Sequence, residues 1–309
     1  LVGSEMCIRD SFILLLLLRE QFGSLSAATQ TVITSIDSNK ITKPSTLMLR
    51  EWLSYIFLIG IGASLYPQAI QRIYAAKSRK TLNQSLAIMT FLPFGTALIA
   101  VITGIYGLAY VPGLEGAATD QVLARLLRII QEGSTLGYAF VVVIFSAILA
   151  ALMSTADSAM LSISSMFTKD IYGTFLQPKA READLTAIGK RCSWIVVCIL
   201  TILAILLKDQ ASLVTLIDRK FDILVQLAPA FMIGIHWPRL RSEPTLWGLI
   251  AGLSIALGLA FGPFDFVITG KIWGFHPGLY GLIINAAIAV LGTIILEHRK
   301  PLHLHDFST

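Results

Sequence analysis

Seven long, mostly apolar stretches dominate the sequence and decide its fold class. They cover approximately residues 51–69, 85–110, 137–167, 189–207, 212–236, 244–262 and 277–296. A helix of about 20 apolar residues crosses a bilayer core, and lipid requires every backbone polar group to be satisfied internally. The stretches show no alternation of apolar and polar residues, which excludes barrel strands. The sequence therefore predicts an all-α, polytopic helical membrane protein.

Composition and charge agree with this class and exclude others. The 309 residues are 55% hydrophobic and 14% charged, whereas soluble domains carry about a quarter charged residues. The net charge of +5 comes from basic residues in short loops, where they indicate membrane orientation rather than nucleic-acid binding. Three cysteines form neither a disulfide framework nor a metal-ligand spacing. We expect the lipid bilayer, and no nucleic acid, as a partner.

The sequence divides into four parts. Residues 1–11 begin without an initiator Met and are interpreted as a non-native artefact at the end of a sequenced fragment. Residues 12–50 hold the apolar remnant of a truncated helix, at 12–18, and an extracellular or interfacial loop. Residues 51–236 form the core, and residues 237–309 hold two peripheral transmembrane helices and a tail. We accordingly interpret the chain as a C-terminal fragment of a larger protein.

Basic residues predict the orientation. One set of alternate loops and the C-terminal tail carries thirteen: Arg72, Lys77, Arg79, Lys80, Lys169, Lys179, Arg181, Lys190, Arg191, Arg239, Arg241, Arg299 and Lys300. The opposite set carries seven: Lys40, Lys43, Arg50, Arg125, Arg128, Lys208 and Lys271. The loop richer in Lys and Arg lies in the cytoplasm. We therefore expect a multi-pass protein of the plasma or inner membrane with a cytoplasmic C-terminus.

Residues 146–173 combine an apolar helix with many hydroxyl groups. Small side chains recur every fourth residue in two neighbouring stripes: Ser146, Ala150, Ser154, Ser158 and Ser162, and Ala147, Ala151, Thr155 and Ala159. Such stripes allow close helix packing with hydroxyl bonds across the contact, which is one interpretation. In the other, the hydroxyls of Ser154 and Thr155 and the carbonyl of Ala151 supply three neutral oxygen ligands for a hard cation.

A carboxylate in the same helix adds to the second interpretation. Asp157 lies a turn from Ser154, and ionisable groups inside a membrane usually mark ion or proton paths. Asp157 and Ser158 are therefore a candidate ion exit path. The alternative is a packing carboxylate that pairs with a neighbouring basic or hydroxyl group.

Three stretches resemble the sodium/solute symporter family, in the family's own order. They are "AALMSTADSAMLSISSMFTKDIY" at 150–172, "YPQAIQRIYAAKS" at 66–78 and "LAPAFMIGIHWPRL" followed by "GLIAG" at 227–252. The resemblance implies the leucine-transporter fold, with two five-helix repeats of inverted topology. Residues 51–236 would be the second repeat, helices six to ten. The family carries amino acids, organic acids, vitamins or sugars, which implies a small-molecule solute of one of these classes.

The resemblance also implies site residues. Ala151, Ser154 and Thr155 match the eighth-helix positions that bind sodium in the family, so Na⁺ is the expected coupling ion, with no other metal or cofactor. The sixth helix is expected to break, because Gly60, Gly62 and Pro67 interrupt it. Candidate solute contacts are Gly60, Gly62, Ser64, Tyr66 and Gln68.

Charges in the segment "DRKFD" at 218–222 allow two interpretations. They either pair among themselves and extend toward the interface, or Arg219 and Asp222 form an outer gate. The leading functional hypothesis is a sodium-coupled symporter of a small organic solute, and not an enzyme, because HExxH, GxSxG and phosphate-loop motifs are absent. The alternative is a symporter-like membrane sensor domain of a signalling protein, which needs a long soluble C-terminal extension.

Overall fold

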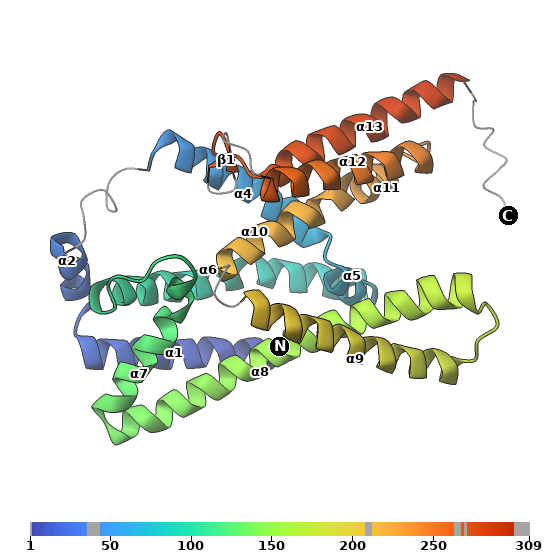
Figure 1. Ribbon diagram of the computed structural model, residues 1–309. Helices are drawn as coiled ribbons and strands as arrows, with labels where there is room; N and C mark the ends of the chain where they lie inside the picture. The colour runs from blue at the N-terminus through green and yellow to red at the C-terminus, as the bar shows by residue number, and fades with distance from the viewer. Residues whose placement is uncertain (1, 36–43, 208–211, 263–266, 269–270, 300–309) are drawn as a thin grey trace. The chain divides into compact units, whose positions relative to one another are not determined.

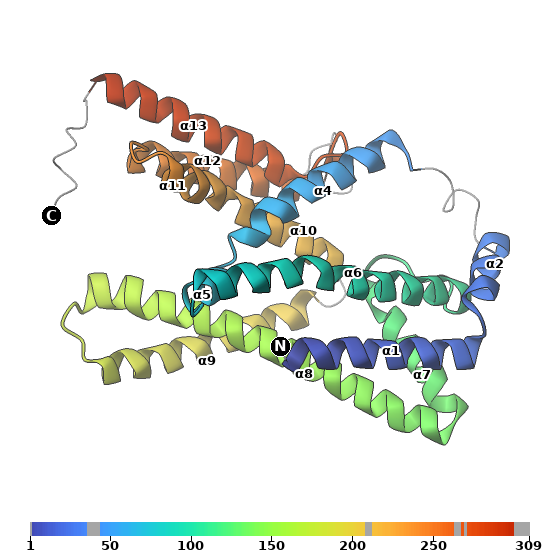
Figure 2. The same ribbon diagram turned by 180° about the vertical axis from the view of Figure 1, so that it is seen from behind.

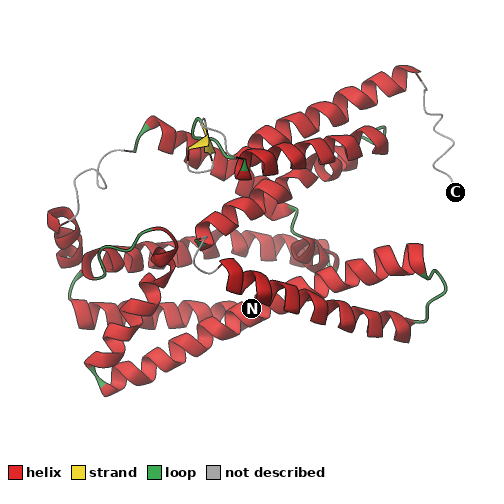
Figure 3. Cartoon of the chain, in the orientation of Figure 1, coloured by secondary structure: helices red, strands yellow, loops and turns green. Residues whose placement is uncertain are grey.

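The computed structural model describes residues 2–35, 44–207, 212–262, 267–268 and 271–299. Nearly all of these residues are helical, with one two-stranded hairpin (Figure 3). The chain divides into two compact units, Leu1–Thr42 with Gln71–Leu213, and Lys43–Ile70 with Val214–Thr309. Four basic residues used for the orientation lie outside the described residues: Lys40, Lys43, Lys208 and Lys300.

Six helices in the described part of the chain are long and apolar enough to cross a membrane. They are Thr46–Ser64, Arg79–Tyr110, Thr135–Leu176, Glu182–Leu206, Ser242–Phe261 and Pro277–His298. Each overlaps one of the predicted apolar stretches, so the polytopic helical class is confirmed. The predicted span at 212–236 is not among them, because there the chain passes through four short helical segments of different type.

The first unit consists of helices. In chain order they are α1 (Val2–Phe22), α2 (Leu25–Ser35), the end of α5 (Pro67–Tyr74), α6 (Arg79–Tyr110), η1 (Gly116–Gln121), α7 (Val122–Gly133), α8 (Thr135–Met166), η2 (Phe167–Leu176) and α9 (Glu182–Leu207). The long helices α1, α6 and α8 can be followed in Figures 1 and 2. The π-helical segment η2 continues α8 directly.

The core of the first unit gathers around α1. Leu18 of α1 and Leu126 of α7 are fully buried in one apolar cluster with side chains of α6 and α8. Between α1 and α2 the chain bends by 64°. There the hydroxyls of Tyr106 and Tyr110 donate to the carbonyls of Gly23 and Phe22, at 2.9 and 2.7 Å. These bonds satisfy carbonyls that the end of α1 leaves without helical partners.

The second unit contains the remaining elements. They are α4 (Thr46–Ser64), the start of α5, α10 (Leu213–Leu224), η3 (Val225–Leu227), η4 (Pro229–Ile233), α11 (Gly234–His236), α12 (Ser242–Phe261), β1 (Val267–Ile268), β2 (Lys271–Ile272) and α13 (Pro277–Arg299). The strands pair antiparallel, with Val267 opposite Ile272. Helices α12 and α13 lie side by side (Figures 1 and 2).

Glycines allow α12 and α13 to pack closely. A Cβ atom at Gly252 would lie 2.7 Å from the carbonyl oxygen of Gly281 and 2.5 Å from Oε1 of Gln226. Gln226 is buried there and donates to the carbonyl of Gly278 at 2.9 Å, while Asn285 donates to the carbonyl of Gln226 at 2.7 Å. The segment η3, which directly follows α10, is therefore held against the α12–α13 pair by buried amides.

The helix break predicted near Pro67 lies between α4 and α5. Residues 60–64 remain in α4, and the chain leaves the helix at Leu65 and Tyr66. Gly60 and Gly62, which were expected to interrupt the helix, therefore lie inside it, and only Pro67 lies at the break. Pro67 explains the difference, because proline lacks an N–H and restricts the residue before it, while glycines are tolerated inside a packed helix.

Candidate functional site

The helix α8, which contains the hydroxyl-rich region, has a side-chain cap at its start and hydroxyl bonds to its own backbone along its length. Ser134 caps the helix by accepting from the Gly137 N–H at 2.9 Å. Further along, serine and threonine hydroxyls donate to carbonyls one turn earlier, as Ser146 does to Val142 at 2.8 Å. Such bonds satisfy a hydroxyl inside an apolar helix without a partner from another element. They also keep the oxygen atoms close to the helix axis.

Two of the three predicted sodium ligands lie in direct contact. Thr155 Oγ1 donates to the carbonyl oxygen of Ala151 at 3.0 Å, and Ser154 is the next residue around the helix. The side chains of Ser154 and Thr155 are exposed in the structure, and Ala151 is half-buried. A hydroxyl that donates its hydrogen keeps its lone pairs, so this bond leaves the Thr155 oxygen able to coordinate a cation. The structure thus places an oxygen cluster on one segment of α8.

The predicted exit-path residues follow directly along α8. Ser158 Oγ donates to the carbonyl of Ser154 at 3.0 Å, which links the two pairs of residues through the helix backbone. The side chain of Asp157 is exposed. A carboxylate therefore lies within one turn of the oxygen cluster.

The sequence interpretation missed a polar contact between α5 and α8. Ser162 Oγ donates to Oε1 of Gln71 at 2.8 Å, and Nε2 of Gln71 donates to Ser165 Oγ at 3.3 Å. The first bond is the interhelical hydroxyl bond that the packing interpretation expects of this stripe. The available signal was a glutamine four residues after Pro67 in an amphipathic helix. The stripe is therefore a packing seam at Ser162, beyond the oxygen cluster.

Two of the five candidate solute contacts, Gly62 on α4 and Tyr66 between α4 and α5, lie against Phe221 of α10. Gly62 is buried, and a Cβ atom there would lie 2.8 Å from Cδ1 of Phe221. The Tyr66 ring meets the Phe221 ring edge-on, with centroids 6.2 Å apart, and the Lys220 ammonium lies 5.2 Å from the Tyr66 centroid. Ser64 Oγ donates to the carbonyl of Ile61 at 2.7 Å. Gly60 is exposed and Gln68 half-buried. The structure thus brings Gly62 and Tyr66 together at one aromatic contact.

The predicted gate residues pair with each other on α10. Arg219 Nη1 lies 3.1 Å from Oδ2 of Asp222, whose side chain is only 1% exposed. The other carboxylate oxygen, Oδ1, accepts from the backbone N–H of Gly278 at 2.8 Å. Asp222 therefore caps the first turn of α13, where a negative charge is stabilised by the helix dipole.

A second polar group that the sequence interpretation missed joins α4, α10 and the start of α13. Ser54, Asp218 and His276 are all buried there. Asp218 belongs to the charged segment at 218–222, and Ser54 lies within an apolar stretch, but neither position indicates His276 as the partner. Their partners are as many as 222 residues apart, so no local pattern could join them.

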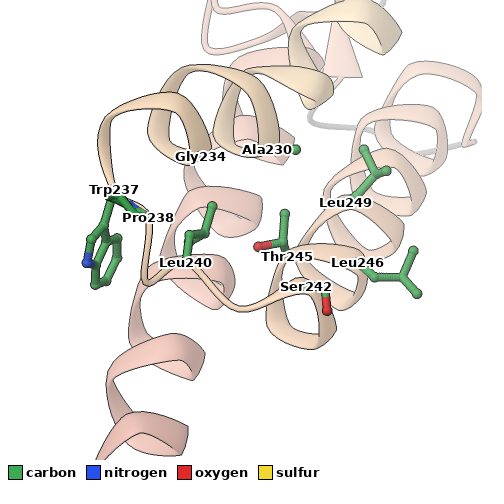
Figure 4. Close-up of a pocket in the computed structure, with 9 residues that line it drawn as sticks. All are labelled: Ala230, Gly234, Trp237, Pro238, Leu240, Ser242, Thr245, Leu246 and Leu249. Atoms are coloured by element: carbon green, nitrogen blue, oxygen red, sulfur yellow. The ribbon is translucent and has the colours of Figure 1, made fainter. Parts of the chain in front are cut away.

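A shallow pocket of about 380 Å³ lies in the second unit, where α11 turns into α12 (Figure 4). Its lining residues are Ala230, Gly234, Trp237, Pro238, Leu240, Ser242, Thr245, Leu246 and Leu249. None of these nine is titratable, and none is a predicted site residue. The pocket therefore offers mainly apolar contact, with the hydroxyl groups of Ser242 and Thr245 as its polar side chains.

Taken together, the long apolar helices define a class of protein: a polytopic helical membrane protein. A helix interrupted at Pro67 and neutral oxygens inside a long apolar helix are typical of transporter sites. Comparison with known proteins supplies the particular family. Residues 4–252 match the sodium:solute symporter family, and the chain belongs to that family.

Individual relatives are similar at low identity. The chain is 26% identical over 243 residues to the osmoregulated proline transporter OpuE of Bacillus subtilis. The matched region covers 77% of the chain and 46% of that protein. It is 27% identical over 264 residues to a sodium/proline symporter of Salmonella typhimurium, covering 81% and 50%. A sodium/glucose cotransporter of Vibrio parahaemolyticus is 23% identical over 224 residues, covering 69% and 40%. The chain spans about half the length of the curated relatives it matches.

Proposed function

We propose that the protein is a sodium-coupled symporter of a small organic solute in the cell membrane, with its C-terminus in the cytoplasm. The observation that carries this proposal is the oxygen cluster of Ala151, Ser154 and Thr155 within the stretch that matches the symporter family. Family membership supports sodium coupling. The names of the relatives, which include proline and glucose carriers, support a solute of the amino acid, organic acid, vitamin or sugar class.

The chemistry of the cluster suits a reversibly bound monovalent cation. Carbonyl and hydroxyl oxygens replace water around the ion but carry no formal charge, so they do not retain it permanently. Because Thr155 donates its hydrogen to the Ala151 carbonyl, its lone pairs face away from that bond. A transporter of this kind alternates between two conformations. Sodium and solute are coupled if both bind one of these conformations more tightly than they bind the second.

The remaining predicted residues take secondary roles in this proposal. Ser64, Tyr66 and Gln68 border the helix break, and together with Gly60 and Gly62 of α4 they are the proposed solute contacts. Asp157 and Ser158, next to the cluster on α8, lead the ion toward its exit. Arg219 and Asp222 form the proposed outer gate. They act on it by fixing the position of the first turn of α13. These roles agree with the inverted-repeat arrangement of the family, in which ion and solute sites lie at broken helices.

Uptake by the purified full-length protein in proteoliposomes tests the function. We expect an inward sodium gradient, but not a potassium gradient, to drive uptake of at least one of two radiolabelled solutes, L-proline and D-glucose. The variant with Ser154→Ala and Thr155→Ala removes two neutral ligands, and we expect it to lose this sodium-driven uptake.

Ser146→Ala is the matched control, because Ser146 lies on the same helix and makes the same type of backbone bond. It should retain uptake. Uptake by the double variant with unchanged sodium dependence would contradict the site. If neither solute is transported, exchange of ²²Na⁺ across the vesicle membrane is measured instead, and a wild-type protein without such exchange contradicts the function.

A further inference from the structure

The second unit contains a buried group of polar side chains that takes no part in the proposed sodium coupling. Ser54 of α4 lies 2.6 Å from Nδ1 of His276, the residue before α13. On the other side of the imidazole ring, Nε2 lies 3.7 Å from Oδ2 of Asp218 on α10. His276 is 1% exposed, and its Nε2 and Oδ1 of Asp218 have no hydrogen-bond partner among the described residues.

The Ser54 hydroxyl has one hydrogen and two acceptors within reach. Its oxygen lies 2.9 Å from the Glu51 carbonyl and 2.6 Å from His276 Nδ1. With a neutral ring, the hydroxyl donates to Nδ1, and the ring hydrogen on Nε2 faces Asp218. With a charged ring, Nδ1–H donates to the Ser54 oxygen, and the hydroxyl donates to the Glu51 carbonyl. Both protonation states are fully bonded at Nδ1 without movement of any heavy atom.

Ion pairs connect the ring to a carboxylate on its Nε2 side. Asp218 lies 3.7 Å from Nε2 and 3.6 Å from the ammonium of Lys271, which also pairs with Glu51. A positive charge on the ring would therefore have a carboxylate partner at Asp218.

We propose that His276 is a reversible proton-binding site that joins α4, α10 and α13. A proton transferred from hydronium forms the Nδ1–H bond, leaves water behind and adds one positive charge to the ring. The Ser54 hydrogen turns from Nδ1 to the Glu51 carbonyl in the same step. The site shares no residue with the oxygen cluster of α8, so it does not depend on the proposed function.

Titratable and charged groups face the ring from each neighbouring element. Helix α4 contributes Glu51, whose carboxylate pairs with Lys271 of β2, and Tyr55, whose ring centroid lies 5.4 Å from that of His276. Lys271 Nζ also lies 3.6 Å from Asp218. The remaining charged or titratable groups are Asp222 and Arg219 on α10, Tyr280 on α13 and the exposed Arg50 on α4.

Nitrogen NMR of the full-length protein in lipid nanodiscs tests the site. Every other histidine is replaced by Gln, and the remaining histidine is labelled with ¹⁵N on both ring nitrogens. At high pH we expect a neutral ring with its hydrogen on Nε2. As the pH falls, Nδ1 should become protonated while the protein stays folded. A ring that stays neutral until unfolding, or a neutral form with its hydrogen on Nδ1, would overturn the proposal.

Two substitutions separate the proton site from an ordinary packed histidine. Ser54→Ala removes the acceptor for Nδ1–H, and Asp218→Asn removes the facing charge, so each should shift proton uptake by the ring to lower pH. A second single-histidine protein that keeps only the exposed His236 is the control, and its titration should not respond to either substitution. If a variant does not fold, the wild-type ring state still decides.

Discussion

At the scale of single residues, the polar contacts of this protein include bonds within one helical turn and bonds to a distant partner. Thr155 and Ser158 bond to carbonyls of their own helix, which sequence spacing allows one to anticipate. Asp222 accepts from a backbone N–H that lies 56 residues away. The first kind of contact keeps oxygen atoms available to an ion, and the second kind joins elements.

Asp222 offers a direct test of a buried partner. Asp222→Ala leaves the Arg219 guanidinium and the Gly278 N–H without their shared acceptor, and breaking a buried ion pair in this way costs about 3–5 kcal/mol. Asp222→Asn should cost less, because its amide oxygen can still accept from Gly278. Denaturant unfolding of the purified full-length protein in detergent measures both.

Asp184→Ala is the reference for an exposed pair, since Asp184 and Arg181 are largely exposed. It should change stability by less than about 1 kcal/mol. If Asp222→Ala were as mild as Asp184→Ala, the cap on α13 would have no structural role.

At the scale of elements, the contact between α4 and α10 depends on the absence of a side chain at Gly62. The Phe221 ring occupies the space that a Cβ atom would need. Gly60, one half-turn away, has nothing within 4 Å of its Cβ position among the described residues. Two glycines that look equivalent in the sequence therefore differ in what they do.

Gly62→Ala should destabilise the protein, because overpacking a filled contact costs about 1–3 kcal/mol. Gly60→Ala should be neutral or slightly stabilising, since alanine favours helix over glycine. Thermal unfolding of the full-length protein compares the two. Phe221→Leu in the Gly62→Ala background should recover part of the loss.

Equal unfolding temperatures for the two alanine variants would show that α4 and α10 are not in this contact. A Phe221→Leu substitution that destabilises Gly62→Ala further would show that the ring is not the group in conflict.

The sequence predicted element type better than element contact. Helices were anticipated from apolar length, and the break near Pro67 from proline chemistry, although the glycines placed it a few residues too early. The change of helix type between α10 and α11 was not anticipated, because residues 212–236 were assigned to one span in spite of the charges at 218–222. The partnerships of Ser54 with His276 and of Gln71 with Ser162 join distant parts of the chain, and no local periodicity encodes them.

At the scale of the whole molecule, the chain is a helical membrane protein of the sodium:solute symporter family. Composition and three motifs were enough to predict that class and family, because both depend on properties spread along the chain. The complete ion site was not predictable in the same way. Its proposed ligands on α8 are known by position, whereas any ligand from another helix depends on how helices meet.

The most direct test of the account is sodium binding by the purified full-length protein, measured as ²²Na⁺ bound at equilibrium. Thr155→Val, which keeps the shape but removes the oxygen, should weaken binding at least about tenfold, or ~1.4 kcal/mol. Thr155→Ser and Ser146→Ala should bind as the wild type does. Wild-type affinity in a folded Thr155→Val protein that also carries Ser154→Ala would contradict a sodium site on α8.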